Sequence, residues 1–427
     1  MAEPSSIKIA VIGGGLAGAT IAHSLLRHAH LDVHVYESAP EFSERGAAVG
    51  LASDAQRALK QVLGATETSA LLEKAGAVVQ ASTRLCIGSG THAGTILLDL
   101  GGGDPADAER VLHRASLLRE LLAPLPTSRL HASKALSAIT PTTEGNVKVT
   151  FGDGQEETFH AVIGADGIFG AVRRHVLQDA ADAEGPSAAG FWDCRNLVPF
   201  EKAREVLGAK YFEQDRQYGW AGNGAFVVHD VLENRTKVQC VISAVEKESP
   251  KDRKRPLTRE FLEETLRDWL DGPVGKGMIE GGQLMLDQPD PQAYSQWEHK
   301  STSTFANGRV CVAGDAAHAT TPWQGAGAGQ AFEDALVLGT LLGETKDPSE
   351  IAHAFQAYSA VRKDRCQRVI DSSRGTGLIF CGQDPEAGLE PEKMMGLLAP
   401  RWGFIGDIDF DAYKKEALAK MKEIRGV

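Results

Sequence analysis

The stretch Ile7-Lys8-Ile9-Ala10-Val11-Ile12-Gly13-Gly14-Gly15-Leu16-Ala17-Gly18 decides the fold of this chain. Its first six residues are mostly apolar and β-branched, which is typical of a buried strand. The pattern GxGxxG, formed by Gly13, Gly15 and Gly18, then leads into the helical pattern of residues 19–28. Glycines at these positions permit a tight turn and let backbone N–H groups approach a pyrophosphate at the helix N-terminus.

A second strand-like run, residues 31–36, ends at Glu37, which follows Gly18 by 19 residues. A carboxylate at the end of this strand can accept hydrogen bonds from both ribose hydroxyls of a dinucleotide. The strand-helix-strand unit therefore predicts a dinucleotide site. The motif does not distinguish NAD from FAD.

Residues 310–328, VCVAGDAAHATTPWQGAGA, favour FAD. A buried strand ends at Asp315, and a loop that contains Pro322 leads into a second helix. An acid at the strand end can bind a polyol such as the ribityl chain, and the helix N-terminus can stabilise negative charge on a reduced flavin ring. NAD has no ribityl chain and needs neither group.

Composition excludes several classes of protein. The 427 residues include 45 Lys and Arg against 57 Asp and Glu, a net charge of −12, which argues against nucleic-acid binding. No apolar run approaches the roughly 18 residues of a membrane span, and the N-terminus lacks the pattern of a secretory signal, so we expect a cytoplasmic protein. Six scattered cysteines without a CxxC pair or a nearby His at metal spacing predict neither a metal site nor a disulfide framework.

Two segments interrupt the alternation of strands and helices. Residues 82–87 and 95–100 alternate like a hairpin, and residues 181–300 carry strand-like segments rich in aromatic and polar residues. Residues 111–122 show a helical pattern. We expect an α/β fold with three parts: a discontinuous Rossmann-like FAD-binding domain (1–80, 105–180 and 301–375), an inserted, mainly antiparallel β-sheet substrate domain (81–104 and 181–300), and a C-terminal helical region (376–427).

Four motifs, in this order, resemble those of the single-component FAD-dependent aromatic hydroxylases, the group A flavoprotein monooxygenases. They are GGGLAG with Glu37, Leu112-His113-Arg114, Gly164-Ala165-Asp166-Gly167 with Arg173, and Ala313-Gly314-Asp315-Ala316-Ala317-His318 with Pro322. Within this family the chain is most similar to fungal salicylate hydroxylase-like monooxygenases, over nearly its whole length.

This resemblance implies an FAD cofactor, with NADPH or NADH as co-substrate and no separate domain for it. Asp166 matches the motif that contacts both FAD and the nicotinamide nucleotide, and Asp315 matches the residue that binds the ribityl chain. Family members usually carry a polar residue where this chain has Gly170. The other cofactor residues that the resemblance implies are Gly13, Gly15, Gly18, Glu37, Ala48 and Arg114 toward the adenosine and pyrophosphate, and Pro322, Gly325, Gly327 and Ala328 at the isoalloxazine.

The candidate catalytic and substrate residues lie in the inserted domain. Arg195 resembles an arginine that related dearomatising hydroxylases place over the substrate, where it can hold a phenolate or carboxylate. His229 falls where those relatives have a tyrosine-proline pair, and a histidine can take a phenol proton at neutral pH. A surface arginine and a core histidine stay open as alternatives. Trp323 is a further candidate substrate contact, and for His318 we expect a structural role in its turn rather than proton transfer.

The resulting hypothesis is an FAD-dependent monooxygenase that hydroxylates a phenolic substrate, a salicylate- or orsellinate-type acid, through a flavin C4a-hydroperoxide, with NAD(P)H as electron donor. Loss of carbon dioxide is one open outcome, and a dearomatised product from a polyketide-derived hydroxybenzaldehyde is another. A non-catalytic FAD-binding redox or interaction module also stays open. The expected partners are a small phenol and molecular oxygen, with no nucleic acid and no membrane span, in a monomer or homodimer.

Overall fold

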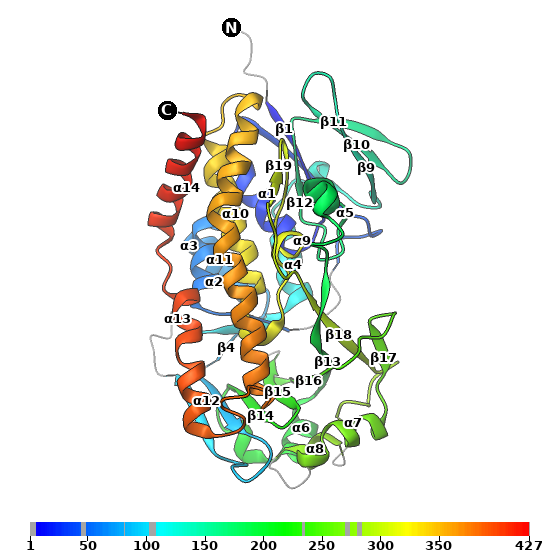
Figure 1. Ribbon diagram of the computed structural model, residues 1–427, viewed down its shortest axis with the longest axis vertical. Helices are drawn as coiled ribbons and strands as arrows, with labels where there is room; N and C mark the ends of the chain where they lie inside the picture. The colour runs from blue at the N-terminus through cyan, green and yellow to red at the C-terminus, as the bar shows by residue number, and fades with distance from the viewer. Residues whose placement is uncertain are drawn as a thin grey trace.

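The computed structural model describes residues 6–43, 48–80, 82–101, 108–232, 235–269, 274–279 and 284–426. Figure 1 shows two halves, one above the other: a parallel sheet with its helices, and a large sheet with three short helices below it. The strands are β1 (Ile7–Ile12), β2 (Leu31–Tyr36), β3 (Ala48–Leu51), β4 (Val78–Val79), β5 (Ser82–Ile87), β6 (Ile96–Gly101), β7 (Arg110–His113), β8 (Leu130–His131), β9 (Leu136–Pro141), β10 (Val147–Phe151), β11 (Glu156–Phe159), β12 (Ala161–Gly164), β13 (Ser187–Pro199), β14 (Arg216–Gly222), β15 (Ala225–Leu232), β16 (Lys237–Val245), β17 (Lys254–Pro256), β18 (Gln292–Glu298), β19 (Ala306–Asn307) and β20 (Val310–Val312).

The helices connect and cover these sheets. They are α1 (Leu16–Leu26), α2 (Ser53–Leu63), α3 (Ala65–Lys74), α4 (Arg114–Leu122), α5 (Ala171–Leu177), α6 (Phe200–Leu207), α7 (Arg259–Thr265), α8 (Gly275–Ile279), α9 (Asp315–His318), α10 (Gly327–Gly343), α11 (Ile351–Phe380), α12 (Pro391–Leu398), α13 (Pro400–Gly406) and α14 (Phe410–Arg425), with a 3-10 turn at η6 (Pro322–Gln324).

The upper half is built on a six-stranded sheet in the order β19-β20-β12-β1-β2-β8. All its strands from β20 to β8 run parallel. Parallel sheets are covered on both faces, and β1, β12 and β20 are accordingly almost entirely buried. The carboxyl ends of these three strands deliver their turns to one edge of the sheet, which is where open α/β sheets bind ligands.

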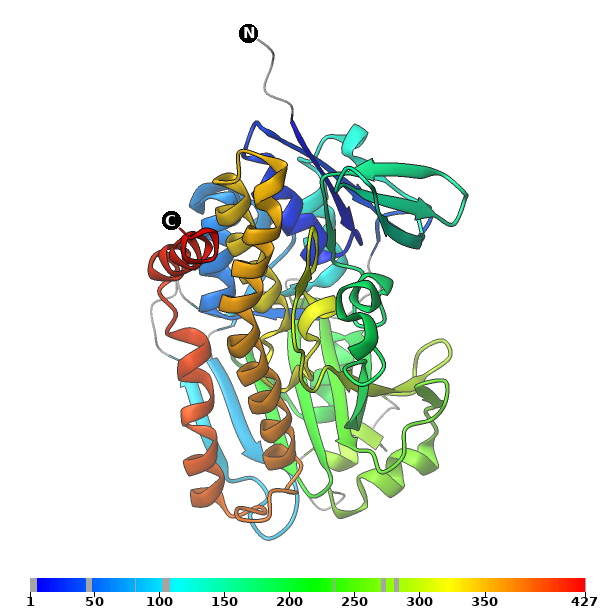
Figure 2. The same ribbon diagram turned by 45° about the horizontal axis from the view of Figure 1, so that its top comes forward.

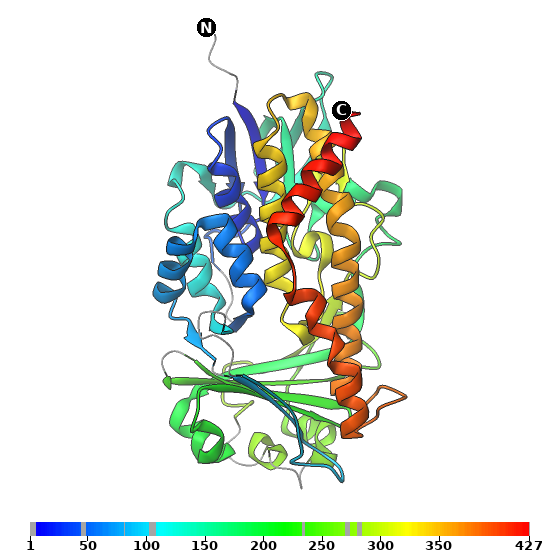
Figure 3. The same ribbon diagram turned by 90° about the vertical axis from the view of Figure 1, so that its left-hand side faces the viewer.

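The lower half is an eight-stranded sheet in the order β17-β18-β13-β16-β15-β14-β5-β6. Neighbouring strands are antiparallel except β14 and β5, which are parallel. The expected hairpin is confirmed, because β5 and β6 pair antiparallel at the sheet edge. One face of the sheet packs on α6, α7 and α8 in a separate hydrophobic core, and Figure 3 shows the other face turned toward the parallel-sheet half.

The expectation of one helix over residues 111–122 was wrong at its start. Residues Arg110–His113 form β7, which pairs antiparallel with β3 and β4, and α4 begins only at Arg114. A short apolar run does not by itself distinguish a strand from a helix turn, and here the pairing with residues about 60 positions away decides.

The long helix α11 runs beside both halves (Figures 1 and 3). It passes through the predicted domain boundary at residues 375 and 376 without a break. Figure 2 shows α12 and α13 alongside β5 and β6, so the C-terminal helices close one side of the lower half. Among the helices of the described residues, none is long and apolar enough to cross a membrane.

Candidate active site

A cavity of about 1360 Å³ lies between the carboxyl edge of the parallel sheet and the open face of the eight-stranded sheet. Pockets for one small ligand usually measure about 300–1,000 Å³. The cavity wall includes the glycine-rich turn after β1, the loop after β20 and side chains of β13, β15 and β16. Its size and position fit a dinucleotide together with a small second ligand.

The turn after β1 accepts only glycine at its two ends. Gly13 has φ +109°, and a Cβ there would lie 2.2 Å from the carbonyl oxygen of Ala165. A Cβ on Gly18 would lie 1.9 Å from the carbonyl oxygen of Gly13. Gly13 and Gly15 line the cavity, whereas Gly18 seats α1 against the turn. Gly15, Leu16 and Ala17 line the cavity, and no side chain of the described residues caps this helix start, so its N–H groups can cradle a phosphate.

Glu37 closes this turn from the end of β2. One carboxylate oxygen accepts a hydrogen bond from the Gly14 N–H at 2.8 Å, and the other accepts from the Ala39 N–H at 2.8 Å. The side chain also lines the cavity. A carboxylate has about four acceptor positions, so Glu37 can hold the turn and still accept from a ribose.

Asp166 follows β12 and is directed into the same cavity. Burial raises the pKa of its carboxyl, its Oδ2 accepts from the Val172 N–H at 3.1 Å, and its Oδ1 is buried with no hydrogen-bond partner among the described residues. A Cβ on Gly170 would lie 2.2 Å from this carboxyl group. The carboxyl packs directly over residue 170, so a side chain there would require the Asp166 carboxyl to move.

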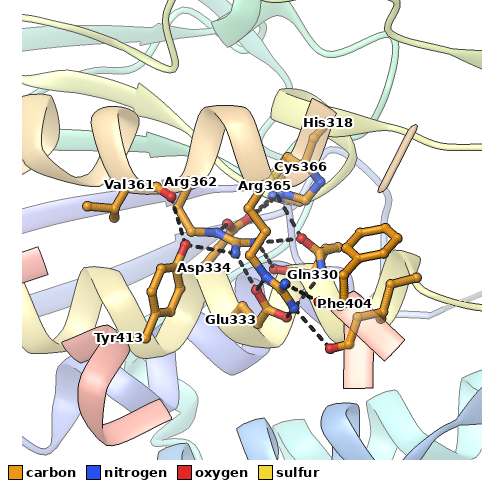
Figure 4. Close-up of polar contacts among 12 residues, drawn as sticks. His318, Gln330, Glu333, Asp334, Val361, Arg362, Arg365, Cys366, Phe404 and Tyr413 are labelled. Carbon is orange, nitrogen blue, oxygen red and sulfur yellow. Dashed lines mark hydrogen bonds and ion pairs between the residues drawn. The ribbon is translucent and has the colours of Figure 1, made fainter. Parts of the chain in front are cut away.

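Asp315, the first residue of α9, lines the cavity after Gly314, which has φ +58°. A buried network that includes His318, Asp334 and Arg362 (Figure 4) holds the turn in place through Gly314. Asp334 Oδ2 accepts from the Gly314 N–H at 2.7 Å and lies 2.6 Å from His318 Nε2, while Arg362 Nε donates to Asp334 Oδ1 at 2.7 Å. The network thus connects α10 and α11 to the turn that presents Asp315.

Burial and neighbouring charges together determine the protonation of Asp334 and His318. Burial opposes ionisation of Asp334, but the cationic His318 and Arg362 outweigh it and lower the pKa of Asp334 to about 2. Burial also opposes protonation of His318, but Asp334 raises its pKa well above the usual value. His318 therefore has the structural role that we expected, through a carboxylate rather than directly through the backbone. The ligand atoms of His318, Asp334 and Cys366 lie within 4.8 Å of one another, but the positive charges of Arg362 and of protonated His318 disfavour a metal ion there.

The substrate side of the cavity is the open face of the large sheet. Side chains alternate between the two faces of a strand, so every second residue of a strand reaches the cavity. The residues of the three central strands that do so are Asp193 and Arg195 of β13, Phe226, Val228 and Asp230 of β15, and Gln239, Val241 and Ser243 of β16.

Aromatic side chains form one wall of this region. Phe226 stacks on Phe380 with ring centroids 4.4 Å apart, and Trp323 lies edge-on to Phe191 at 4.9 Å. Gly377 makes room for Trp323, because a Cβ there would lie 2.5 Å from the indole ring. Sequence reasoning found Trp323 but missed Phe380 and Trp402, which also line the cavity, since no motif marks the C-terminal helices that carry them.

Arg195 reaches the cavity, with a side chain 41% exposed and Nη2 at 3.0 Å from Asp193 Oδ2. His229 does not reach it. The His229 ring lies on the opposite face of β15, stacked on Tyr218 at 5.0 Å, and neither nitrogen has a hydrogen-bond partner in the described part of the chain. Burial lowers its pKa to about 3. As a correction to our expectation, His229 is a neutral core residue that cannot touch a ligand in the cavity.

The remaining predicted cofactor residues lie together. Those that line the same cavity are Ala48, Arg114, Pro322, Gly325, Gly327 and Ala328. Gly325 has φ +64°, and the space where its Cβ would project is open. Glycine turns from two strand ends, an uncapped helix start and the carboxyl of Asp315 thus provide the kinds of group that FAD requires. Their individual roles in binding remain predictions.

Comparison with known proteins agrees with this geometry. The family model described as an FAD binding domain matches residues 6–373. The chain is 31% identical to 6-methylsalicylate 1-monooxygenase of Aspergillus terreus, over 99% of this chain and 94% of the relative. It is 29% identical to a salicylate hydroxylase of Pseudomonas putida, over 97% of this chain and 95% of the relative.

The solved structure of a salicylate hydroxylase substrate complex has the same fold, with a TM-score of 0.82 and 24% identity over 97% of this chain and 98% of the other. The expected fold class is therefore confirmed: an α/β, Rossmann-like FAD-binding domain with an inserted, mainly antiparallel sheet and C-terminal helices. The chain belongs to the FAD binding domain family, among the flavin-dependent aromatic monooxygenases that resemble salicylate hydroxylases.

Proposed function

We propose that this protein uses FAD and NAD(P)H to hydroxylate a phenolic aromatic compound with molecular oxygen. The observation that carries the proposal is the single cavity that joins the dinucleotide-binding turns to an aromatic-walled region on the open face of the sheet. A cofactor and a planar ring can therefore meet inside one enclosure. The two relatives named for salicylate hydroxylation support the same class of substrate.

The cofactor end is built to fix an extended dinucleotide. The N-terminus of α1 would bind the pyrophosphate, Glu37 the adenosine ribose and Asp315 the ribityl chain. Bound FAD would supply the chemistry that passes electrons from NAD(P)H to oxygen and one oxygen atom to the ring. The N-terminus of α10, which follows the loop at Gly325, would stabilise negative charge on the flavin ring.

The substrate end orients a ring and keeps water out. Phe226, Trp323 and Phe380 offer faces and edges for an aromatic ring. Arg195 can anchor a carboxylate or phenolate by charge-assisted hydrogen bonds. We therefore propose an o-hydroxybenzoate-type acid of the salicylate or orsellinate kind as substrate, with loss of carbon dioxide when the carbon that bears the carboxylate is attacked.

The test is NAD(P)H oxidation by the FAD-loaded protein against salicylates, orsellinate-type acids and hydroxybenzaldehydes, with hydrogen peroxide and carbon dioxide measured in the same reactions. We expect at least one phenolic acid to stimulate oxidation at least tenfold with little peroxide. Oxidation that no phenol stimulates would instead support a non-catalytic flavoprotein. The product of each active compound separates decarboxylating from dearomatising chemistry.

A further inference from the structure

We propose that Asp230 receives the aromatic hydroxyl of the substrate and takes its proton, and that the polar end of the cavity around it selects a hydroxyl and excludes a carboxylate. This polar end consists of Gln80, Glu109, Asp230 and Gln239, all of which line the cavity. The inference rests on the proposed hydroxylation of a phenol and adds a residue and a selectivity to it.

The position of Asp230 follows from the alternation of β15. Val228 and Asp230 face the cavity, while His229 between them faces the core. The Asp230 side chain is held by amides: Gln80 Nε2 donates to Oδ1 at 3.2 Å, Gln239 Nε2 donates to Oδ2 at 3.4 Å, and the side chain of Gln217 adds a third hydrogen bond. Only 2% of Asp230 is exposed. The carboxylate is fixed in place with acceptor capacity remaining for a ligand.

One buried atom next to this carboxylate lacks a partner. Gln80 Oε1 is buried and makes no hydrogen bond to any described residue. Gln80 is 4% exposed, and its amide nitrogen already donates to Asp230. The unpaired amide oxygen can only accept a hydrogen bond. Buried polar atoms are nearly always paired in folded proteins. The Gln80 oxygen therefore points to a ligand that brings a donor, as an aromatic hydroxyl does.

The charge at this end favours a neutral group. Glu109 lines the cavity here, and burial, followed by the charges of Asp230 and Asp54, raises its pKa to about 7. Arg195 lies two strands away, on β13, and Arg114 lines the cavity at the start of α4. A carboxylate substituent at this end would be repelled by the carboxyl groups of Asp230 and Glu109, whereas a hydroxyl could donate a hydrogen bond to them.

Asp230 is also suited to accept a proton. Burial raises its pKa to about 6, and the amide hydrogen bonds only partly offset this rise. At neutral pH the group is ionised yet more basic than an exposed aspartate, as a general base requires. The aromatic O–H bond breaks, its proton passes to a carboxylate oxygen of Asp230, and the electron pair stays on the phenolate oxygen. The ring gains electron density at its ortho and para carbons, and the proton returns when product leaves.

The test compares wild type, Asp230→Asn and Asp99→Asn, all FAD-loaded. Asp99 is a carboxylate of the same sheet outside the cavity, paired with Arg84, and serves as the control. Binding is read from the flavin spectrum with resorcinol as the hydroxyl probe and benzoate as the carboxylate probe. We expect Asp230→Asn to weaken the binding of resorcinol at least tenfold and to strengthen the binding of benzoate. Asp99→Asn should bind both probes as wild type does. Equal affinities for both probes in wild type and Asp230→Asn would overturn the proposal.

Turnover gives an independent readout. Wild-type hydroxylation should fall as pH decreases through about 6, because Asp230 becomes protonated. Asp230→Asn should lose this pH dependence and form product at least 100-fold more slowly, with peroxide in its place. If the rate of Asp230→Asn falls with pH as it does in wild type, Asp230 is not the base.

If no phenol is hydroxylated by wild type, the proposed function fails, while the two binding probes still decide the role of Asp230. If Asp230→Asn does not hold FAD, Gln80→Met is the second variant: we expect at least fivefold weaker resorcinol binding and unchanged benzoate binding, and equal resorcinol binding overturns the proposal.

Discussion

At the residue scale, one position along β15 separates a core side chain from a cavity side chain. His229 attracted attention because histidine titrates near neutral pH, but the strand alternation directs it into the cluster of Tyr211, Tyr218 and Trp220. Asp230, the next residue, faces the cavity. Which face of a strand is buried depends on the helices that pack on it, so the sequence of the strand alone does not decide it.

The buried neutral His229 predicts a stability that depends on pH. Its folded pKa of about 3 lies below the ordinary value of 6.5, so the unfolded chain binds more protons between these values. The contribution to the free energy of unfolding is complete above pH 6.5 and is lost as pH falls toward 3. His229→Phe should flatten this dependence, measured by urea unfolding at pH 4 and pH 7. An unchanged difference between the two pH values would show that His229 is not the responsible group.

Asp315 carries a second prediction at this scale. It lines the cavity at the start of α9, and Asp315→Ala removes its acceptor for the ribityl hydroxyls while leaving the backbone turn in place. We expect FAD affinity to fall at least tenfold, measured by the fluorescence of released flavin. The exposed Asp182→Asn, on a carboxylate that pairs with Arg174, is the matched control. Equal affinity in wild type and Asp315→Ala would remove Asp315 from the cofactor site.

At the element scale, the network of His318, Asp334, Glu333 and Arg362 holds α9, α10 and α11 together. All four side chains are buried, and Arg362 also forms an ion pair with Glu333. Such a network stabilises a structure only while all its members are present, because removal of one leaves another buried charge without its partner. It therefore makes the geometry of the Asp315 turn depend on helix packing.

Asp334→Asn tests this dependence. Removing one partner of a buried ion pair costs about 3–5 kcal/mol, so the free energy of unfolding at pH 7 should fall by about that amount. The folded pKa of about 2 lies below the ordinary 3.8, so the contribution of Asp334 is present above pH 3.8 and lost as pH falls through 2. FAD affinity should fall as well, because the Asn amide has only one acceptor oxygen and cannot accept from both Arg362 and the Gly314 N–H. The exposed Asp371→Asn on α11 is the control, and equal stability of the two variants would refute the role of the network.

The strands also show which parts of the structure could be predicted from the sequence. The strands Ile7–Ile12 and Leu31–Tyr36 were predicted to the residue, because strong apolar patterns define them and a glycine turn ends the first. The strand Arg110–His113 was missed, because distant pairing with β3 defines it. The motif-bearing turns could be predicted since each is local in sequence. The polar end of the cavity could not be predicted, because Gln80, Glu109 and Asp230 come from separate parts of the chain.

At the scale of the whole molecule, residues from the N-terminal and the C-terminal parts of the chain together line the cavity. The N-terminal turn after β1 forms one end, and Trp402 of α13 and Phe380 of α11 close the aromatic wall. Trp402 and Phe380 have ring centroids 6.4 Å apart. An oxygen-transfer site must exclude water from the reacting atoms. We therefore expect the C-terminal helices to contribute to the reaction, although the match to the FAD-binding family ends at residue 373.

Trp402→Ala tests this closure. The substitution opens the wall without touching the cofactor turns, so we expect FAD content to stay unchanged. The share of NAD(P)H oxidation that ends as hydrogen peroxide should rise several-fold because water gains access. Peroxide and product are measured together, and an unchanged ratio would mean that α13 does not seal the site.

The most direct test of the central claim is the fate of isotopic oxygen gas. The FAD-loaded protein is supplied with NAD(P)H, labelled oxygen and the phenolic compound that best stimulates oxidation, and the product mass is read. We predict one labelled oxygen atom in the aromatic product. Product without label, or label recovered only in hydrogen peroxide with every stimulating compound, would contradict the assignment as an aromatic monooxygenase.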